Sequence, residues 1–407
     1  MKLTIMAAGF VFFLSIFFVY AGGSREIEEA EKHTALPGTS EQSVQAEISW
    51  AEGEDLFPDK IEVKYAQGFS VEYRNNYKIL RVLKPYPGAP EGFTYILLQR
   101  GTPMPLGFND AIVIEVPVRS FVSMSTSYLG ALDMLGAGQF LTGVDTGKYI
   151  YNPEIRRRVA DYQVLEVSSE YEPNIELLLE MAPEVVMTSA MGNKWDVHPK
   201  MLEVNLPVVV NGEWNETSPL GRAEWLKFIS LLFNKEQEAA RLFAAVEQQY
   251  TMLKEAVFAF SEEKPKVFTG APYGDSWDVP GGRSYLSALL SDAGCTYIWG
   301  DTVATGSIPI SFETVFYKAG EAEFWLNAGW NWREMEELIS FDDRLTSFTA
   351  YEKGNIYGNT KRMNEDGGND YWESGVMNPH VLLADLIKIL HPEILPDHQL
   401  VYYKRLE

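Results

Sequence analysis

Two glutamates occupy equivalent positions in two similar stretches of the chain. Glu176 lies near the start of residues 173–184, which are followed by an apolar run, and Glu313 lies near the start of a similar stretch at 311–321. Each stretch predicts a short helix, a tight turn and a strand. A helix start favours a carboxylate, because unpaired backbone N–H groups and the positive end of the helix dipole lie there. The repetition therefore predicts two similar lobes, each with one acidic tip.

Polar and aromatic side chains follow several of the strands that the sequence predicts. In α/β lobes, ligands bind beyond the carboxyl ends of the strands. Flat aromatic rings suit a large planar ligand, and an arginine pairs with a carboxylate, a catecholate or a phosphate. For each aromatic residue, ordinary packing is the alternative. The candidate ligand-binding residues are Ser125, Thr126, Met191, Trp214, Tyr273, Trp277, Arg362, Tyr371 and Trp372.

The histidines and the single cysteine do not indicate a metal site. The histidines are His33, His198, His380, His391 and His398, and they lack the close pairing of zinc or manganese ligands. We expect no bare metal ion, so an iron cargo would arrive already chelated. Haem is compatible, with Met191, a tyrosine or a histidine as axial ligand. Cys295 is expected to be a buried small residue, and no internal disulfide is possible.

The sequence also lacks the motifs of common hydrolases. It has no Ser–His–Asp ordering, no Gly-x-Ser-x-Gly elbow and no His-Glu-x-x-His motif. The glycine-rich stretch at 281–282 lacks the lysine of a P-loop. We therefore expect a non-catalytic protein without a cofactor of its own.

Charge and the N-terminus indicate an exported protein. The 407-residue chain has 57 acidic and 34 basic side chains and a formal net charge of −23, which excludes nucleic acid as a partner because phosphate binding needs clustered cations. Residues 1–21 combine Lys2, an apolar run and a small-residue cleavage site, as a signal peptide does. Residues 22–59 are predicted to be a flexible tether. No cysteine lies near the cleavage site, so we expect a periplasmic or extracytoplasmic protein without a lipid anchor.

The rest of the chain divides into a β-rich preamble and two α/β series. Alternating patterns predict strands at 60–65, 69–73 and 77–82, and further strands at 95–98 and 111–114. From Ser120 strands alternate with helices, as in parallel βαβ units. An uninterrupted helical pattern then runs from Asn234 to about Phe260. We expect an N-terminal lobe with its preamble at 60–233, an inter-lobe helix at 234–262 and a C-terminal lobe at 263–407, with a strand region at 348–357.

The chain resembles the periplasmic binding proteins for iron complexes and cobalamin that serve ABC importers. The resemblance covers about residues 60–407 and rests on the order of several segments. These segments are 123–145, 173–187, 219–225, 280–285, Glu313 and 369–373. It implies two α/β lobes joined by one long rigid helix, with the ligand in a cleft between the lobes. The preamble departs from the smallest members of the family and indicates an extended subgroup.

The resemblance also implies partners. The family's two permease-docking glutamates map by motif onto Glu176 and Glu313, with the alternative that both merely start helices. The implied ligand is a siderophore, haem or corrinoid chelate, and the implied partner is an ABC permease dimer with its ATPase. We expect a monomer, and a small hinge motion because a continuous helix resists bending.

Two other functions remain open on the sequence alone. One is an exported carbohydrate-active hydrolase that uses paired carboxylates and tryptophan platforms. The other is a solute sensor or an adhesin built on the same two-lobed shell. Turnover of a glycan would favour the first, and a neighbouring permease and ATPase would favour the transport function.

Overall fold

The computed structural model describes residues 53–108, 111–169, 172–260, 264–274, 276–329 and 331–407. Residues 48–407 form one compact unit, and the account below concerns its described residues. The expected signal peptide and most of the expected tether lie outside the described residues. Among the described residues, no helix is both long and apolar enough to span a membrane.

The β-rich preamble forms a sheet, which we call the extension. Its strands are Phe69–Tyr73 (β1), Tyr77–Val82 (β2), Phe93–Gln99 (β3) and Ile112–Val116 (β4), in the order β1-β2-β3-β4. The first two pairs are antiparallel, and β3 and β4 are parallel. In β3 the hydroxyl of Tyr95 accepts a hydrogen bond from the Val210 N–H at 2.9 Å, which ties the extension to the next sheet.

The strand predicted at 60–65 is wrong, because a side chain takes the hydrogen bonds that a neighbouring strand would have made. The fully buried carboxylate of Glu224 accepts hydrogen bonds from the backbone N–H groups of three consecutive residues. These are Lys64, Tyr65 and Ala66, at 2.9, 2.6 and 2.8 Å. The alternating pattern therefore marks an extended segment held by a carboxylate rather than by a sheet.

The N-terminal lobe is built on a parallel sheet with the order β11-β10-β5-β6-β7. Its strands are Phe121–Ser123 (β5), Leu141–Val144 (β6), Leu165–Glu166 (β7), Val185–Thr188 (β10) and Val208–Val210 (β11). Strands β10 and β11 are buried at every position, as expected for a sheet covered on both faces. The short strands Ser168–Ser169 (β8) and Glu172–Pro173 (β9) pair with each other.

Short helices follow most strands of this lobe. They are Leu129–Met134 (α1), Pro153–Ala160 (α2), Ile175–Met181 (α3), His198–Glu203 (α4), Pro219–Ala223 (α5) and Trp225–Ser230 (α6), with 3-10 turns at Thr126–Tyr128 (η1), Gly138–Phe140 (η2) and Glu213–Asn215 (η3). Local chemistry sets their ends. The side chain of Asn174 caps α3 by accepting from the Leu177 N–H at 3.0 Å, and Ala182 ends this helix in the left-handed conformation.

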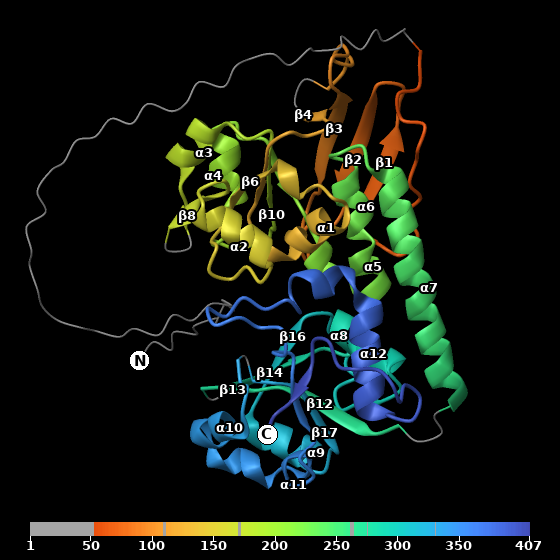
Figure 1. The fold of residues 1–407 in the computed structure, drawn as a ribbon, viewed down its shortest axis with the longest axis vertical. Helices are drawn as coiled ribbons and strands as arrows, with labels where there is room; N and C mark the ends of the chain where they lie inside the picture. The colour runs from red at the N-terminus through yellow and green to blue at the C-terminus, as the bar shows by residue number, and fades with distance from the viewer. Residues whose placement is uncertain (1–52, 109–110, 170–171, 261–263, 275, 330) are drawn as a thin grey trace, which may run out of the picture. The chain divides into compact units, whose positions relative to one another are not determined.

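One long helix, Glu236–Phe260 (α7), packs against helices of both lobes. It contacts α6 of the N-terminal lobe and α12 of the C-terminal lobe, and Figure 1 shows it running alongside both. At its start, Glu236 pairs with the fully buried Lys78 of the extension. The prediction of two α/β lobes joined by a long helix, with a β-rich extension, is confirmed.

The C-terminal lobe repeats the α/β plan. Its main sheet has the order β15-β12-β17-β18-β19, in which only β19 is antiparallel to its neighbour, and a smaller sheet has the order β13-β14-β16. The strands are Lys266–Gly270 (β12), Pro272–Tyr273 (β13), Ser276–Pro280 (β14), Thr296–Tyr297 (β15), Ser307–Ile310 (β16), Phe324–Ala328 (β17), Ile356–Gly358 (β18) and Lys404–Arg405 (β19). The helices are Tyr285–Asp292 (α8), Phe312–Ala319 (α9), Met335–Phe341 (α10), Thr349–Glu352 (α11) and Pro379–Leu390 (α12), with 3-10 turns at Asp343–Ser347 (η4) and Ser374–Met377 (η5). The strand region expected at 348–357 is therefore partly wrong, because α11 precedes β18.

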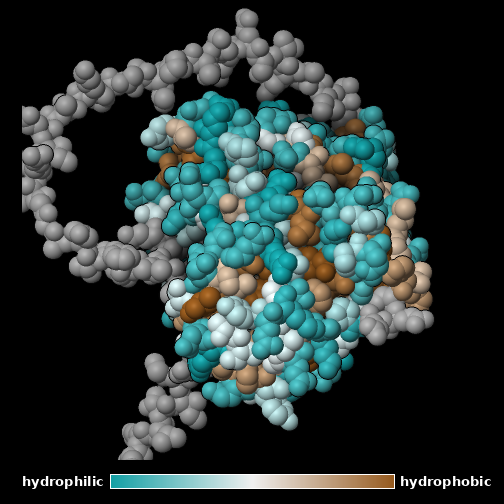
Figure 2. Space-filling view, turned by 60° about the horizontal axis from the view of Figure 1, so that its bottom comes forward, coloured by the Kyte–Doolittle hydropathy of each residue, from teal (hydrophilic) through white to brown (hydrophobic). Residues whose placement is uncertain are grey.

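Each lobe contributes a few residues to the hydrophobic core of the other. Val376 and Met377, which follow α7 by more than a hundred residues, belong to the core of the N-terminal lobe. Leu220 and Ala223 of α5 belong instead to the core of the C-terminal lobe. On the surface, Figure 2 shows apolar areas separated by hydrophilic side chains on the face it displays.

Candidate functional site

The N-terminal lobe presents polar groups where its parallel strands end. Ser125 and Thr126 follow β5 and are half-buried. The hydroxyl of Ser125 already caps η1, because it accepts from the Ser127 N–H at 3.3 Å and lies 2.9 Å from the Ser127 hydroxyl. Hydrogen bonds within this turn therefore hold the Ser125 side chain at the end of β5.

The loop after β10 exposes an apolar surface. Met191 is 52% exposed, and its backbone is fixed by Asp196, whose two carboxylate oxygens accept the N–H groups of Met191 and Gly192 at 2.8 Å. Trp195 in the same loop is 59% exposed. Sequence reasoning missed Trp195, although its position four residues after the predicted Met191 was a usable signal. Two large exposed side chains on a loop whose backbone is held by Asp196 suit contact with a large apolar ligand.

Trp214 lies after β11 in η3 and is half-buried. Its indole nitrogen is buried and has no hydrogen-bond partner among the described residues. Buried donors are normally satisfied. An acceptor atom of a ligand that reached this ring would therefore receive a hydrogen bond from the indole N–H of Trp214.

In the C-terminal lobe, Tyr273 and Trp277 have opposite environments. Tyr273 of β13 is 52% exposed, whereas Trp277 of β14 is 0% exposed. The Trp277 ring packs against Trp325 and Phe348 with ring centroids 5.4 and 5.9 Å apart, and its nitrogen donates to the Thr269 carbonyl at 3.0 Å. The prediction that Trp277 contacts ligand is wrong, because strand alternation turns this residue into the core.

The predicted ligand contacts at 362–372 also differ in their exposure to solvent. Tyr371 is only 2% exposed and packs edge-on against Tyr403, so its prediction as a ligand contact is also wrong. Trp372 is 47% exposed and meets the Tyr371 ring edge-on, with centroids 4.7 Å apart. The Nε of Arg362 pairs with the buried Asp370 at 2.6 Å, so its charge already has a protein partner.

Segment 362–373 of the C-terminal lobe is tied directly to residues 150–156 of the N-terminal lobe. The Glu373 carboxylate accepts the N–H groups of Tyr151 and Asn152 at 2.7 and 3.0 Å. The amide of Asn364 donates to the Ile150 carbonyl at 2.9 Å, and a further ion pair joins Arg156 of α2 to Asp366. In Figure 1 this blue loop lies next to α2. Burial raises the pKa of Glu373 to about 7.

A buried ion pair lies where the two lobes pack together. Arg222 of α5 pairs with Glu213, and its guanidinium lies 5.1 Å from the ring centre of Tyr285, at the start of α8 in the other lobe. Sequence reasoning did not single out these residues. The signal was the motif at 219–225, which we used for the family resemblance without assigning a role to its arginine.

A pocket of about 330 Å³ opens between the extension and the two lobes. Most of its lining comes from the extension and from the loop after β11, and Thr305 comes from the C-terminal lobe. The lining residues are Gln67, Gly68, Lys84, Tyr86, Pro87, Gly88, Ala89, Gly212, Asn215, Glu216, Thr217 and Thr305. The lining combines polar and apolar groups. Sequence reasoning missed this pocket, because the extension was placed in the first lobe without a role.

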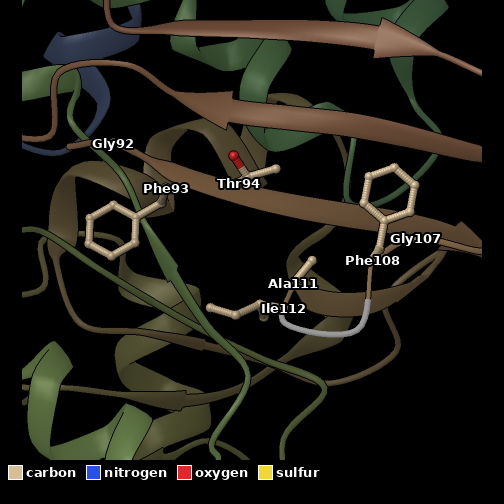
Figure 3. A pocket seen from close by; sticks show the side chains of 7 residues that line it. All are labelled: Gly92, Phe93, Thr94, Gly107, Phe108, Ala111 and Ile112. Carbon is tan, nitrogen blue, oxygen red and sulfur yellow. The ribbon is translucent and has the colours of Figure 1, made fainter.

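A second pocket, of about 400 Å³, lies within the extension and is larger. Figure 3 shows its lining, with the rings of Phe93 and Phe108 on either side of Thr94, Ala111 and Ile112. It has no charged side chain in its lining and receives no residue from the sheets of the two lobes. The pocket that includes Thr305 is therefore the better candidate for a ligand site.

The two acidic tips are exposed. Glu176 lies in the first turn of α3 and Glu313 in the first turn of α9, which is capped by the Ser311 hydroxyl through the Thr314 N–H at 3.3 Å. The negative charge of Glu313 raises the pKa of Arg344, although the hydrogen bond to Asp342 is the larger cause. Both glutamates are accessible to a partner.

The described residues do not group into a metal site. No cluster of three or more His, Cys, Asp or Glu side chains among them could hold a metal ion. Burial lowers the pKa of His380 to about 4, and His391 contacts the Gly294 carbonyl at 3.2 Å. Cys295 is 6% exposed, and burial raises the pKa of its thiol to about 12, so this thiol is a poor ligand.

Comparison with known proteins gives a family match across both lobes. Residues 121–363 match a family described as "Periplasmic binding protein". A haem-binding periplasmic protein from Pseudomonas aeruginosa has a TM-score of 0.52 and 18% identity, over 68% of this chain and 94% of that one. A molybdate-binding periplasmic protein of an ABC transporter from Haemophilus influenzae has a TM-score of 0.53 and 18% identity, over 70% of this chain and 90% of that one. These structures share the fold.

Two relatives from Methanocaldococcus jannaschii are named uncharacterized lipoproteins. One is 26% identical over 81% of this chain and 82% of its own length, and the other is 22% identical over 94% and 95%. They overturn the expectation that this chain has no lipid anchor. That expectation relied on the absence of a cysteine near one predicted cleavage site, which is weaker evidence than relatives that match nearly the whole chain.

Proposed function

The chain belongs to the periplasmic binding protein family, the substrate-binding proteins of ABC transporters, and from this premise we propose that it captures a chelated iron complex, haem or a corrinoid outside the cytoplasm. The main support is a set of large exposed side chains in loops and at strand ends, Met191 in one lobe and Tyr273 and Trp372 in the other. They offer apolar contact to a large flat ligand. The family consists of binding proteins rather than enzymes, so the function is capture and delivery.

The ligand class can be tested directly. We expect protein purified from its native host to carry a coloured chelate, visible in its absorbance spectrum and identifiable by mass spectrometry. Titration of ligand-free protein with haemin, cyanocobalamin and a ferric catecholate siderophore should give tight binding to at least one of them. Binding of molybdate or of a free metal ion, with no binding of these chelates, would contradict the proposal.

We propose that Glu176 and Glu313 contact the permease. Each is an exposed carboxylate at the first turn of a helix, and charge pairs at the rim of an interface set orientation and association rate more than affinity. Glu176→Lys combined with Glu313→Lys should abolish uptake by cells or vesicles while ligand affinity stays unchanged. Glu180→Lys with Glu321→Lys, two exposed glutamates near the same helices, is the matched control. Normal uptake by the first double variant would refute the docking role.

We also propose that the protein is held at the outer face of the membrane by a lipid, as the names of its relatives suggest. The single thiol of the sequence, that of Cys295, is buried and donates to the Leu290 carbonyl at 3.2 Å, so the lipid would be attached to a group other than a thiol. Metabolic labelling with an alkyne fatty acid should mark the mature protein and move it to the detergent phase. An unlabelled protein in the aqueous phase would contradict the anchor.

A further inference from the structure

The loop between β2 and β3, residues 83–92, lies over strand ends of the N-terminal lobe. A Cβ atom at Gly192, shortly after β10, would collide with the ring of Tyr86. A Cβ atom at Gly212, just after β11, would lie 3.2 Å from the Lys84 carbonyl oxygen, which also accepts from the Asn215 amide at 3.3 Å. The loop therefore covers the carboxyl ends of β10 and β11, the edge at which α/β sheets bind ligands.

Two buried carboxylates fix the start of the extension in this position. Glu224 accepts the N–H groups of residues 64–66, as described above. Glu216 accepts the N–H groups of Gln67 and Gly68 at 2.9 and 2.8 Å and the indole N–H of Trp225 at 3.0 Å. The loop belongs to a sheet that is already held in place. A ligand that binds beneath the loop therefore loses little binding free energy to ordering of the protein.

The pocket beneath the loop offers a free positive charge. Lys84 is exposed, and among the described residues its ammonium group has no hydrogen-bond or ion-pair partner. Glu216 also lines the pocket, but its oxygens already accept the N–H donors named above, and burial raises its pKa. Thr217 and Thr305 add hydroxyl groups, the second from the C-terminal lobe. A cation with nearby hydroxyl donors suits a carboxylate or a phosphate.

We propose that loop 83–92 determines ligand specificity by binding an anionic arm of the cargo, a carboxylate or phosphate carried by a metal chelate, with Lys84 as its charge partner. This inference rests on the proposed capture of a chelate. The loop precedes residues 121–363, so it lies outside the part of the chain that matches the family. Because Thr305 faces the same pocket, an arm bound there contacts both lobes.

Charge reversal at Lys84 tests the proposal with two metal chelates that carry different anionic groups. Haemin carries two carboxylates, and cyanocobalamin carries one phosphodiester in a molecule of no net charge. Titration followed by tryptophan fluorescence should show that Lys84→Glu weakens haemin binding about tenfold or more. The matched control is Lys60→Glu, since Lys60 also precedes the N-terminal lobe but pairs only with Asp55, away from the pocket. The control should bind haemin within about twofold of wild type.

The outcomes separate this inference from the proposed function. Equal haemin affinity in wild type and Lys84→Glu overturns the role of the loop. Should another of these chelates bind and haemin not, equal affinity for that chelate in wild type and Lys84→Glu overturns the role of the loop and leaves the proposed capture of a chelate intact. Failure of haemin, cyanocobalamin and a ferric catecholate alike rejects the proposed function as well. Thermal unfolding checks that each variant folds, and Lys84→Gln replaces Lys84→Glu if the reversed charge lowers the Tm.

Discussion

Two of the regions in which the lobes meet use their polar groups in opposite ways. At 150–156 and 362–373, the charged groups named above have partners within the protein, as in the pair of Arg362 with Asp370. At the pocket beneath loop 83–92, Lys84 has no such partner among the described residues. A charge that is already paired holds structure, whereas an unpaired charge beside a cavity is available to a ligand. The contacts between residues 150–156 and 362–373 therefore hold the lobes together, and the pocket is the expected site of ligand recognition.

The largest expected effect comes from the carboxylate that anchors the extension. Glu224→Ala would leave three backbone N–H groups without their acceptor and would break the ion pair of the buried Lys227 ammonium. Loss of one partner of a buried charge pair costs about 3–5 kcal/mol. Urea unfolding should show a loss of this size, and Glu255→Ala, on the exposed side of α7, should show almost none. A loss below about 1 kcal/mol would mean that the extension is not held by this group.

A smaller effect on stability, dependent on pH, is expected from Glu373, which joins segment 362–373 to residues 150–156. Burial raises the pKa of Glu373 from 4.5 to about 7, so the folded protein holds this proton more tightly than the unfolded chain. The stability gained from that proton is fully present below about pH 4.5 and is lost as the pH rises through about 7. The carboxyl faces the N–H groups of Tyr151 and Asn152, and the negative charges of Asp370 and Asp133 act in the same direction as burial.

Glu373→Gln removes this titration. Relative to wild type, the variant should gain free energy of unfolding as the pH is raised from 5 to 8. Glu365→Gln, an exposed residue of the same segment, should keep a constant difference from wild type over that range. Parallel curves for Glu373→Gln and wild type would show that Glu373 does not titrate there.

The smallest expected effect concerns the exposed aromatic residues. Tyr273→Ala with Trp372→Ala should weaken haemin binding about tenfold, because each ring contributes about 0.5–1.5 kcal/mol to an aromatic contact. The thermal stability should hardly change, since both side chains are about half exposed. Leu106→Ala, at 97% exposure in the extension, serves as the control for loss of an exposed apolar side chain. Wild-type affinity in the double variant would remove these rings from the site.

Local patterns predicted the elements well and the environment of individual side chains less well. The helix from Asn234 was visible because its apolar positions keep one period over many residues, and α7 covers nearly the same range. Trp277 was ambiguous, because a strand shows only that neighbours alternate and not which of them faces the core. The segment at 60–65 alternates as a strand does, yet its N–H groups bind Glu224, which lies about 160 positions away in the sequence. Such distant contacts leave no local signal.

The same limit applies to the candidate site. Met191 and Tyr273 could be proposed from the sequence because each lies beside a predicted strand, and Trp372 because it lies in a loop rich in Gly, Asn and Asp; all three are exposed. Lys84 could not be proposed, because nothing in the local pattern places the β2–β3 loop over Gly192 and Gly212. Arg362 was proposed for its charge, but its partner Asp370 only becomes evident when the chain folds back on itself.

The exchange of core residues bears on how this chain can be divided. A fragment that ended after α7 would have an empty space where Val376 and Met377 fill the first lobe, and a fragment that began there would lack Leu220 and Ala223. Neither half is therefore a module that could be expressed or swapped by itself. The helix that looks like a linker in the sequence does not separate two independently folding pieces.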